Sequence, residues 1–315
     1  AAGGKRGGKM KKITVIGSFV MDMVARIAQF PREGQTILGK SLGIFPGGKG
    51  INQCVAAARL GAETEMVGML GRDANGETFR RILREENIRA DCVFSCDIPT
   101  AVAQIQINDA GENKIVVIPS ANYAFGTEDA ERARSAIKGS GLAMLQLEMR
   151  PEVVYRLVDI CAELGVPVML NPAPAIPLGA ELLGKISYLT PNETELEILT
   201  GLPTGTKEEL FAAADRLLEQ GVGHVIATLG SRGAMIADGR TKKIVPGYPV
   251  SPVDTVAAGD SFNGALARCL AAGLEMEESV RFANAVGALT VTKQGAIPSL
   301  PRLSEVEQFL SEREG

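Results

Sequence analysis

Apolar runs of strand length alternate with amphipathic stretches of helix length along most of this 315-residue chain. Such alternation is typical of a parallel sheet whose strands are joined by helices that cover both faces. We therefore predict an α/β fold with a doubly wound, mostly parallel sheet. The expected strands lie at residues 13–16, 65–70, 143–147, 166–170, 187–189 and 225–228. The expected helices lie at residues 50–60, 77–86, 151–164, 193–199, 208–219, 259–272, 277–292 and 305–312.

Two segments break this alternation, at residues 23–45 and 100–118. Both contain short stretches with the period of two that indicates β-strands, and Asn108-Asp-Ala-Gly111 supplies a turn within the second. We predict that they form a small β lid over the strand ends of a single domain at residues 10–315. An apolar outer face on this lid would favour a homodimer formed through the lid.

Composition excludes several classes of protein. The net charge of −4 argues against a nucleic-acid-binding protein, and no apolar run is long enough to span a bilayer. The five scattered cysteines are typical of reduced thiols in the cytoplasm. The single histidine, His224, lies in a strand-like run, which disfavours histidine-dependent triads and multi-histidine zinc sites. Residues 1–9 lack the apolar segment of a signal peptide, so we interpret them as a tag remnant or disordered tail before Met10.

The segment Asp254–Gly264 places a carboxylate, Asp260, in the first turn of an expected helix, after the small residues Ala257, Ala258 and Gly259. The free N–H groups and the positive dipole end of such a turn attract an anion. An acid beside an anion site is explained if it takes a proton from a hydroxyl while the amides hold a phosphoryl group. Alternatively, Asp260 is an ordinary helix cap, and this segment alone does not decide between the two.

A second glycine-rich segment, Gly43–Asn52, nearly matches the nucleotide-binding P-loop G-x-x-x-x-G-K-[ST]. We reject that interpretation because Gly50 stands where the magnesium-binding hydroxyl belongs, and because the segment does not follow the first core strand. The turn can still present N–H groups, Lys49 and Asn52 to a small polar ligand. A simple tight turn before a helix is the alternative.

Polar residues also follow several of the expected strands, where the ligands of such sheets bind. The segments concerned are the end of the first strand at Asp22, Gln146–Glu148, Asn171–Pro174, Pro191–Glu195 and Thr228–Gly233. Taken separately, the fourth could be a helix cap and the fifth could close a hairpin.

Together and in this order, these segments resemble the ribokinase family of carbohydrate kinases, from Met10 to the last helix. The two family signatures stand at Gly47–Asn52 and Asp254–Asp260. The resemblance implies a β lid that often forms a dimer. It also implies transfer of the γ-phosphoryl group of ATP to the primary 5-hydroxyl of a pentose, with D-ribose as the first expectation. Mg²⁺ and K⁺ are the implied cofactors, and no nucleic acid or membrane is implied as a partner.

The resemblance also assigns roles to residues. It makes Asp260 the base and the amides of Ala257, Ala258 and Gly259 the anion hole. The sugar-binding positions are Asp22, Gly48, Lys49, Asn52, Glu148 and Asp260 itself. The nucleotide-binding positions are Asn192, Thr228, Gly230, Ser231, Arg232, Gly233, Gly259 and Asn284. The monovalent-cation positions are Asp254, Val256, Thr290, Lys293, Gly295 and Ser299, several of them through backbone oxygens. Glu195 is linked to magnesium.

One position departs from the family pattern. Val20 stands where ribose-specific members have an asparagine that contacts a sugar hydroxyl, and members that act on deoxyribose have an apolar residue there. An apolar pocket does not reject an added hydroxyl strongly, so ribose can still be accepted. Ribose stays slightly ahead of 2-deoxyribose because the rest of the ribose-binding set is intact. Another sugar or a nucleoside kinase of the same family and a non-catalytic sugar- or nucleotide-binding regulator are the remaining alternatives. A dinucleotide-dependent dehydrogenase is disfavoured because G-x-G-x-x-G does not follow the first strand.

Overall fold

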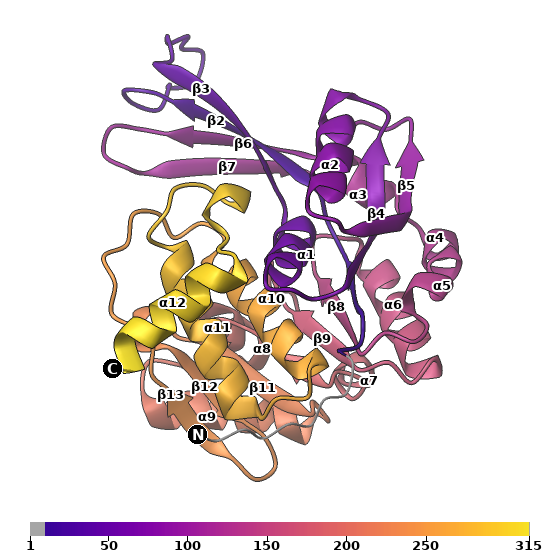
Figure 1. Ribbon diagram of the computed structural model, residues 1–315. Coiled ribbons are helices and arrows are strands. Elements are labelled where there is room, and N and C mark those ends of the chain that lie inside the picture. The colour runs from indigo at the N-terminus through magenta and orange to yellow at the C-terminus, as the bar shows by residue number, and fades with distance from the viewer. Residues whose placement is uncertain (1–9, 315) are drawn as a thin grey trace.

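A nine-stranded sheet forms the centre of the molecule in the computed structural model, which describes residues 10–314 (Figure 1). The strands are β1 (Ile13–Ile16), β4 (Thr64–Gly71), β5 (Arg89–Cys96), β8 (Leu142–Gln146), β9 (Val168–Asn171), β10 (Tyr188–Leu189), β11 (His224–Thr228), β12 (Ala234–Ala237) and β13 (Lys242–Val245). Their order is β13-β12-β11-β10-β9-β8-β1-β4-β5. The strands from β11 to β5 are parallel, and β12 and β13 add an antiparallel edge. The predicted fold class is confirmed.

Helices cover both faces of this sheet, because successive strand residues point to opposite sides. In β1, Ile13 and Val15 pack into one buried apolar cluster and Ile16 into the other. The helices of the first cluster are α1 (Lys49–Arg59), α2 (Ala74–Glu85), α10 (Ala258–Ala271), α11 (Met276–Thr290) and α12 (Leu303–Glu314). Those of the second are α3 (Ser120–Ala124), α4 (Thr127–Arg132), α5 (Arg134–Ile137), α6 (Pro151–Glu163), α7 (Ala180–Leu183), α8 (Glu193–Thr200) and α9 (Lys207–Glu219).

A second, four-stranded sheet forms the lid and extends away from the helices at the upper left of Figure 1. Its order is β3-β2-β6-β7. The strands are β2 (Val20–Arg26), β3 (Ser41–Gly47), β6 (Val102–Ile107) and β7 (Asn113–Ile118). They come from the two segments that interrupt the helix–strand alternation, and the predicted turn at Asn108–Gly111 joins β6 to β7. The separate small sheet expected from the sequence is therefore present.

Asp22 requires a correction, because it does not end the first core strand. That strand stops at Ile16, and Asp22 lies within lid strand β2, paired with Phe45 of β3 and Ala103 of β6. The chain leaves the core strand and enters the lid within four residues. The sequence pattern did not reveal this passage because every residue from Ile13 to Met21 is buried, with no polar exposed segment between the two strands. Asp22 is therefore a residue of the lid and not of the core.

The structure also bears on the expected strands, on the N-terminal residues and on membrane-spanning helices. His224 begins β11, as predicted, whereas β5 was not expected because exposed polar residues interrupt its apolar pattern. The assignment of residues 1–9 to a tag or tail falls outside the described residues. Within residues 10–314, no helix has both the length and the apolar character needed to cross a membrane.

Candidate active site

Most of the polar segments singled out in the sequence gather at the carboxyl-terminal edge of the large sheet. The chain adds β4 and β5 on one side of β1 and then returns to add β8 and the later strands on the other side, so the strand order reverses at β1. In open α/β sheets such a reversal opens a crevice for ligands. Gln146 and Asn171 end β8 and β9, Thr228 ends β11, and Asp22 reaches this region from the lid.

Asp260 lies in the first turn of α10 with only 8% of its surface exposed. Ala257, just before the helix, has a φ of 60°, a left-handed conformation that turns the chain sharply into the helix. Asn52 Nδ2 donates to Asp260 Oδ2 over 2.9 Å, and Gln53 Nε2 donates to Oδ1 over 3.1 Å. Both donors lie on α1, which packs against α10. The carboxylate is thus held between two amides at the positive end of a helix.

Glu148 anchors the start of α1 to the end of the first core strand. Its Oε2 accepts from the backbone N–H of Lys49 over 2.9 Å and from the hydroxyl of Ser18. The same hydroxyl accepts from the N–H of Gly50 over 3.2 Å. A Cβ at Gly50 would lie 2.8 Å from the backbone oxygen of Ser18, so only glycine fits there. This close approach explains why the P-loop hydroxyl is absent at this position.

Three carboxylates surround Lys49 and shape the charge of the site. Burial alone would lower the pKa of Lys49, but Asp260, Glu148 and Glu195 together raise it. Burial raises the pKa of Glu195, and nearby Asp260 adds to that rise against the opposing hydrogen bond from Asn192 N–H and the Lys49 charge. The ammonium therefore stays charged and offsets the carboxylates.

Asp22 has a pKa much closer to neutral pH than an ordinary aspartate. Burial, and to a lesser degree the charge of Glu148, raises the pKa of Asp22 to about 6. This carboxylate is only partly solvated, and within residues 10–314 it forms no ion pair with a cationic side chain. Hydroxyl donors from a polyol would stabilise its charged form.

A cavity of about 650 Å³ lies beside Asp260 at the N-terminus of α10, where Ala258 and Gly259 form part of its wall. Six predicted nucleotide-binding residues line it: Thr228, Gly230, Ser231, Gly233, Gly259 and Asn284. Sequence reasoning missed the apolar part of its wall. That part includes Tyr248, Pro249, Val250, Phe262, Ala288 and Val291. A flat aromatic base fits such an apolar slot, and the glycines allow phosphates to approach the backbone.

The other two predicted nucleotide residues do not line this cavity. Asn192 caps α8 in a reciprocal capping box with Glu195, with both hydrogen bonds at 2.8 Å, and it forms a β-bridge to Thr228. Arg232 forms an ion pair with Glu193 at the start of the same helix. Both residues therefore connect α8 to the β11 turn at the edge of the cavity.

Three of the six predicted cation positions, Asp254, Val256 and Gly295, are joined by hydrogen bonds just before the α10 turn. Asp254 Oδ1 accepts from Val256 N over 3.0 Å, and Oδ2 accepts from Gly295 N over 2.9 Å. The Lys293 ammonium is paired with Glu305, which leaves its backbone oxygen as the group that could bind a cation. Within residues 10–314, no three His, Cys, Asp or Glu side chains cluster as a metal site. Backbone oxygens with one carboxylate nevertheless suit a hard cation.

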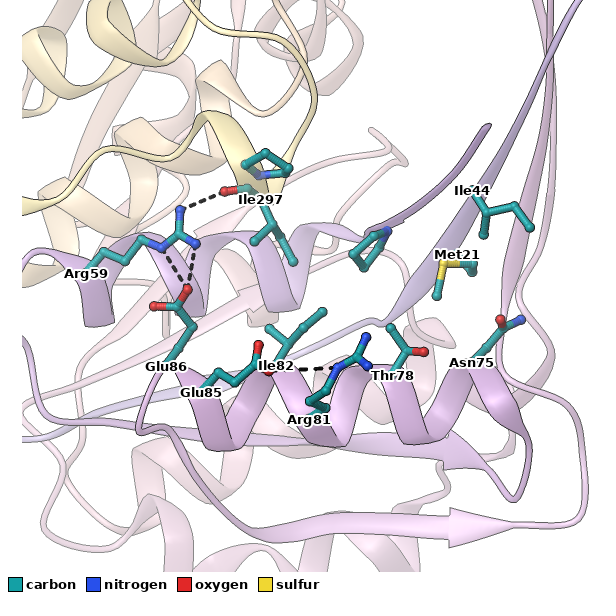
Figure 2. Close-up of a pocket in the computed structure, with 12 residues that line it drawn as sticks. Met21, Ile44, Arg59, Asn75, Thr78, Arg81, Ile82, Glu85, Glu86 and Ile297 are labelled. Atoms are coloured by element: carbon teal, nitrogen blue, oxygen red, sulfur yellow. Dashed lines mark hydrogen bonds and ion pairs between the residues drawn. The ribbon is translucent and has the colours of Figure 1, made fainter. Parts of the chain in front are cut away.

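A separate groove of about 410 Å³ lies behind the root of the lid and shares no lining residue with the cavity above (Figure 2). It is bordered by α2, by Met21 and Ile44 of the lid, and by Ile297. At one end Arg59 forms an ion pair with Glu86 at 2.5 Å and donates to Ile297 O over 2.8 Å. These bonds connect α1 to the loop before α12, which gives the groove wall a structural role.

Comparison with known proteins agrees with this architecture. The sequence pattern described as "pfkB family carbohydrate kinase" matches residues 10–303. The chain belongs to this family of carbohydrate kinases. It is 38% identical to a ribokinase of Bacillus subtilis over 96% of this chain and 100% of that protein. It is 36% identical to a deoxyribokinase of Salmonella typhimurium over 95% of this chain and 98% of that protein.

The fold is also similar to that of solved ribokinases. A structure of the Arabidopsis thaliana ribokinase, complexed with ribose and ATP, superposes with a TM-score of 0.89 and 34% identity. The match covers 95% of this chain and 98% of that one. This carbohydrate kinase is therefore an ATP-dependent sugar kinase, as predicted. The roles of its individual residues and its preferred sugar remain predictions.

Proposed function

We propose that this sugar kinase transfers the γ-phosphoryl group of ATP to the 5-hydroxyl of D-ribose, giving ribose 5-phosphate and ADP. One observation carries the proposal: two adjacent residues belong to two different parts of the site. Gly259 lines the cavity of nucleotide size, and Asp260 is hydrogen-bonded to Asn52 on the sugar side. The N-terminus of α10 is thus the junction of the two halves, where a phosphoryl group in transfer would meet free N–H groups.

In the proposed step, Asp260 takes the proton of the 5-hydroxyl and the freed oxygen attacks the γ-phosphorus. The bond from that phosphorus to the bridging oxygen breaks, and ADP leaves with the electron pair. The amides of Ala257, Ala258 and Gly259 stabilise the charge on the transferred group, which contributes about 3 kcal/mol per donor in comparable sites. Phosphoryl transfer depends mainly on such positioning and electrostatics.

Asp22, Gly48, Lys49, Asn52 and Glu148 are proposed to bind the sugar. Asn52 Oδ1 is buried and has no hydrogen-bond partner within the described structure, so it suits a hydroxyl donor. The raised pKa of Asp22 fits the same role. When the lid lies over the sugar it would exclude water, which otherwise competes for the phosphoryl group.

Two cations are proposed as well. Glu195, whose Oε2 caps α8, would help to hold Mg²⁺ near the nucleotide phosphates, and Mg²⁺ supplies charge neutralisation to phosphoryl groups. Asp254, Val256, Gly295 and the backbone of Thr290, Lys293 and Ser299 would hold K⁺. Because Asp254 already orders the 254–256 turn, a cation there would order the anion hole that follows.

The alternative substrate is 2-deoxyribose, and Val20 favours it. Val20 is 5% exposed and lies two residues from Asp22 on β2, so both side chains point to the same face of the lid. It packs in a small apolar cluster with Ala101 and Ala103. A sugar hydroxyl placed against it would lose a hydrogen bond, which costs about 1–3 kcal/mol. Similar identities to ribokinase and deoxyribokinase relatives do not separate the two sugars.

An assay of ADP release tests the proposal, with ATP, Mg²⁺ and a panel of ribose, 2-deoxyribose, hexoses and nucleosides, each with and without K⁺. We expect ribose to give the highest kcat/KM and Asp260→Ala to lower kcat by about 10²–10⁴-fold or more. An Asp260→Ala variant that turns over as fast as the parent would refute the assignment of the base. A nucleoside preferred over every free pentose would refute the substrate.

The lid is proposed to form a homodimer. Its edge strands expose apolar side chains, including Leu42 at 67%, Ile44 at 54% and Val116 at 59%. Exposed apolar edge strands tend to associate with another chain. We also propose a cytoplasmic location, which the five free thiols favour.

A further inference from the structure

Gln53 lies at the centre of a buried network of amides that ends on Asp260. Its side chain is fully buried on α1, next to Asn52. Gln53 Nε2 donates to Asp260 Oδ1 and to Asn171 Oδ1, each over 3.1 Å. Gln53 Oε1 accepts from Gln146 Nε2 over 2.7 Å. The network joins α1, α10 and the ends of β8 and β9 at Asp260.

The orientation of these amides is fixed from the backbone. Asn171 Nδ2 donates over 3.0 Å to the carbonyl of Thr190, which can only accept. The side-chain oxygen of Asn171 must therefore face Gln53 and accept a hydrogen bond from the Gln53 NH₂ group. The same NH₂ group faces Asp260. Gln53 thus offers a donor to Oδ1 whatever the protonation state of the carboxyl group.

The second oxygen of Asp260 is in a different situation. Oδ2 accepts from Asn52, whose own Oδ1 is buried without a partner in the described structure. Asn52 is therefore free to turn toward a bound sugar without breaking any other side-chain hydrogen bond recorded for it. Nothing comparable can release Oδ1, because Gln53 is locked by Asn171 and Gln146.

We propose that Gln53 is a positioning residue that occupies Oδ1 of Asp260 and reserves Oδ2 for the proton of the sugar hydroxyl. The inference rests on the proposed function of Asp260 as base. A proton on Oδ1 would face the NH₂ of Gln53, donor against donor, so the transferred proton goes to Oδ2. The rotation of the carboxyl group is also restricted, which keeps Oδ2 directed to the hydroxyl.

The test is Gln53→Met, which keeps the length of the side chain and removes its amide. We expect the single-turnover rate of phosphoryl transfer to fall about 10–100-fold, the size of effect that misplaced reacting groups produce. The KM values for sugar and ATP, and the calorimetric Kd for the sugar, should stay within about threefold. A role in folding alone would change binding together with the rate.

Gln146→Met is the matched control. It makes the same replacement at a buried glutamine one hydrogen bond farther from Asp260. Because Asn171 still orients Gln53 in that variant, its rate should fall several-fold less than that of Gln53→Met. Gln53→Glu should be slower than Gln53→Met, since it places a second acid against the carboxylate.

These experiments distinguish a failure of the positioning role of Gln53 from a failure of the role of Asp260 as base. If Asp260→Ala abolishes activity but Gln53→Met keeps its rate within threefold, the positioning role is wrong and the base stands. Equal losses in Gln53→Met and Gln146→Met would also overturn the role of Gln53, as would a parallel loss of sugar binding. If Asp260→Ala stays active, the proposed function itself fails.

Discussion

Lowering the pH should weaken sugar binding to this kinase because Asp22 becomes protonated. This effect is on binding and is separate from any effect of pH on the chemical step. Burial and the charge of Glu148 raise the pKa of Asp22 to about 6. Sugar hydroxyls that donate to its carboxylate favour the charged form, so binding requires a proton to be released as the pH falls below that value. The affinity should therefore be constant above neutrality and decline below pH 6.

The size of the effect follows from the pKa. If only the ionised form binds, a group with a pKa of about 6 leaves roughly a tenth of the protein competent at pH 5 and nearly all of it at pH 7.5. The apparent Kd for the sugar should then rise about tenfold between these two values, which corresponds to about 1.4 kcal/mol.

Isothermal titration calorimetry without ATP measures this Kd directly and avoids the titration of groups that act only in catalysis. Asp22→Asn is the control, because it keeps the shape of the side chain and removes the proton equilibrium. Its affinity should be lower at pH 7.5 and nearly independent of pH. The same tenfold change in Asp22→Asn, or a flat profile in the parent, would refute the reasoning.

Without sugar, lowering the pH should have the opposite effect on stability: the free energy of unfolding should rise as Asp22 becomes protonated. The pKa of Asp22 in the folded protein lies above its ordinary value of 3.8, so the ionised group costs stability above pH 6 and the cost disappears as the pH falls toward 3.8. Relative to Asp22→Asn, the parent should gain about 1 kcal/mol between pH 7.5 and 5, after discounting for partial exposure.

Two further substitutions test the packing and the specificity of the site. Gly264→Ala would place a Cβ 2.6 Å from that of Ala56, where α10 meets α1; we expect a net loss of about 1–2 kcal/mol and a Tm lower by roughly 2–6 °C. Gly287→Ala, whose Cβ would meet nothing closer than 3.7 Å, is the calorimetric control and should not lower the Tm. Val20→Asn should raise the ratio of kcat/KM for ribose over deoxyribose by about tenfold, and an unchanged ratio would remove this position as a determinant of specificity.

The alternation of strand-like and helix-like segments determined the architecture, because burial repeats with the local period of each element. Strand β1 and helix α10 appear close to where the periodicity placed them. The sequence pattern did not locate strands where the alternation of buried and exposed residues was absent or irregular. The unbroken burial from Ile13 to Met21 conceals the passage from core strand to lid, and β5 was missed because it is half exposed.

The sequence by itself also indicated Asp260 and its glycine-rich turn, since the positive end of a helix is a local property. Tertiary structure alone decided what surrounds that carboxylate. Gln53 and Asp260 are 207 residues apart in the chain, and Tyr248 and Phe262 meet in the nucleotide-sized cavity only after α10 and α11 pack on the sheet. Periodicity reports which face of an element is buried, but not which distant amide that face will contact. The orientation of the carboxylate depends on such contacts, so it is set by the fold.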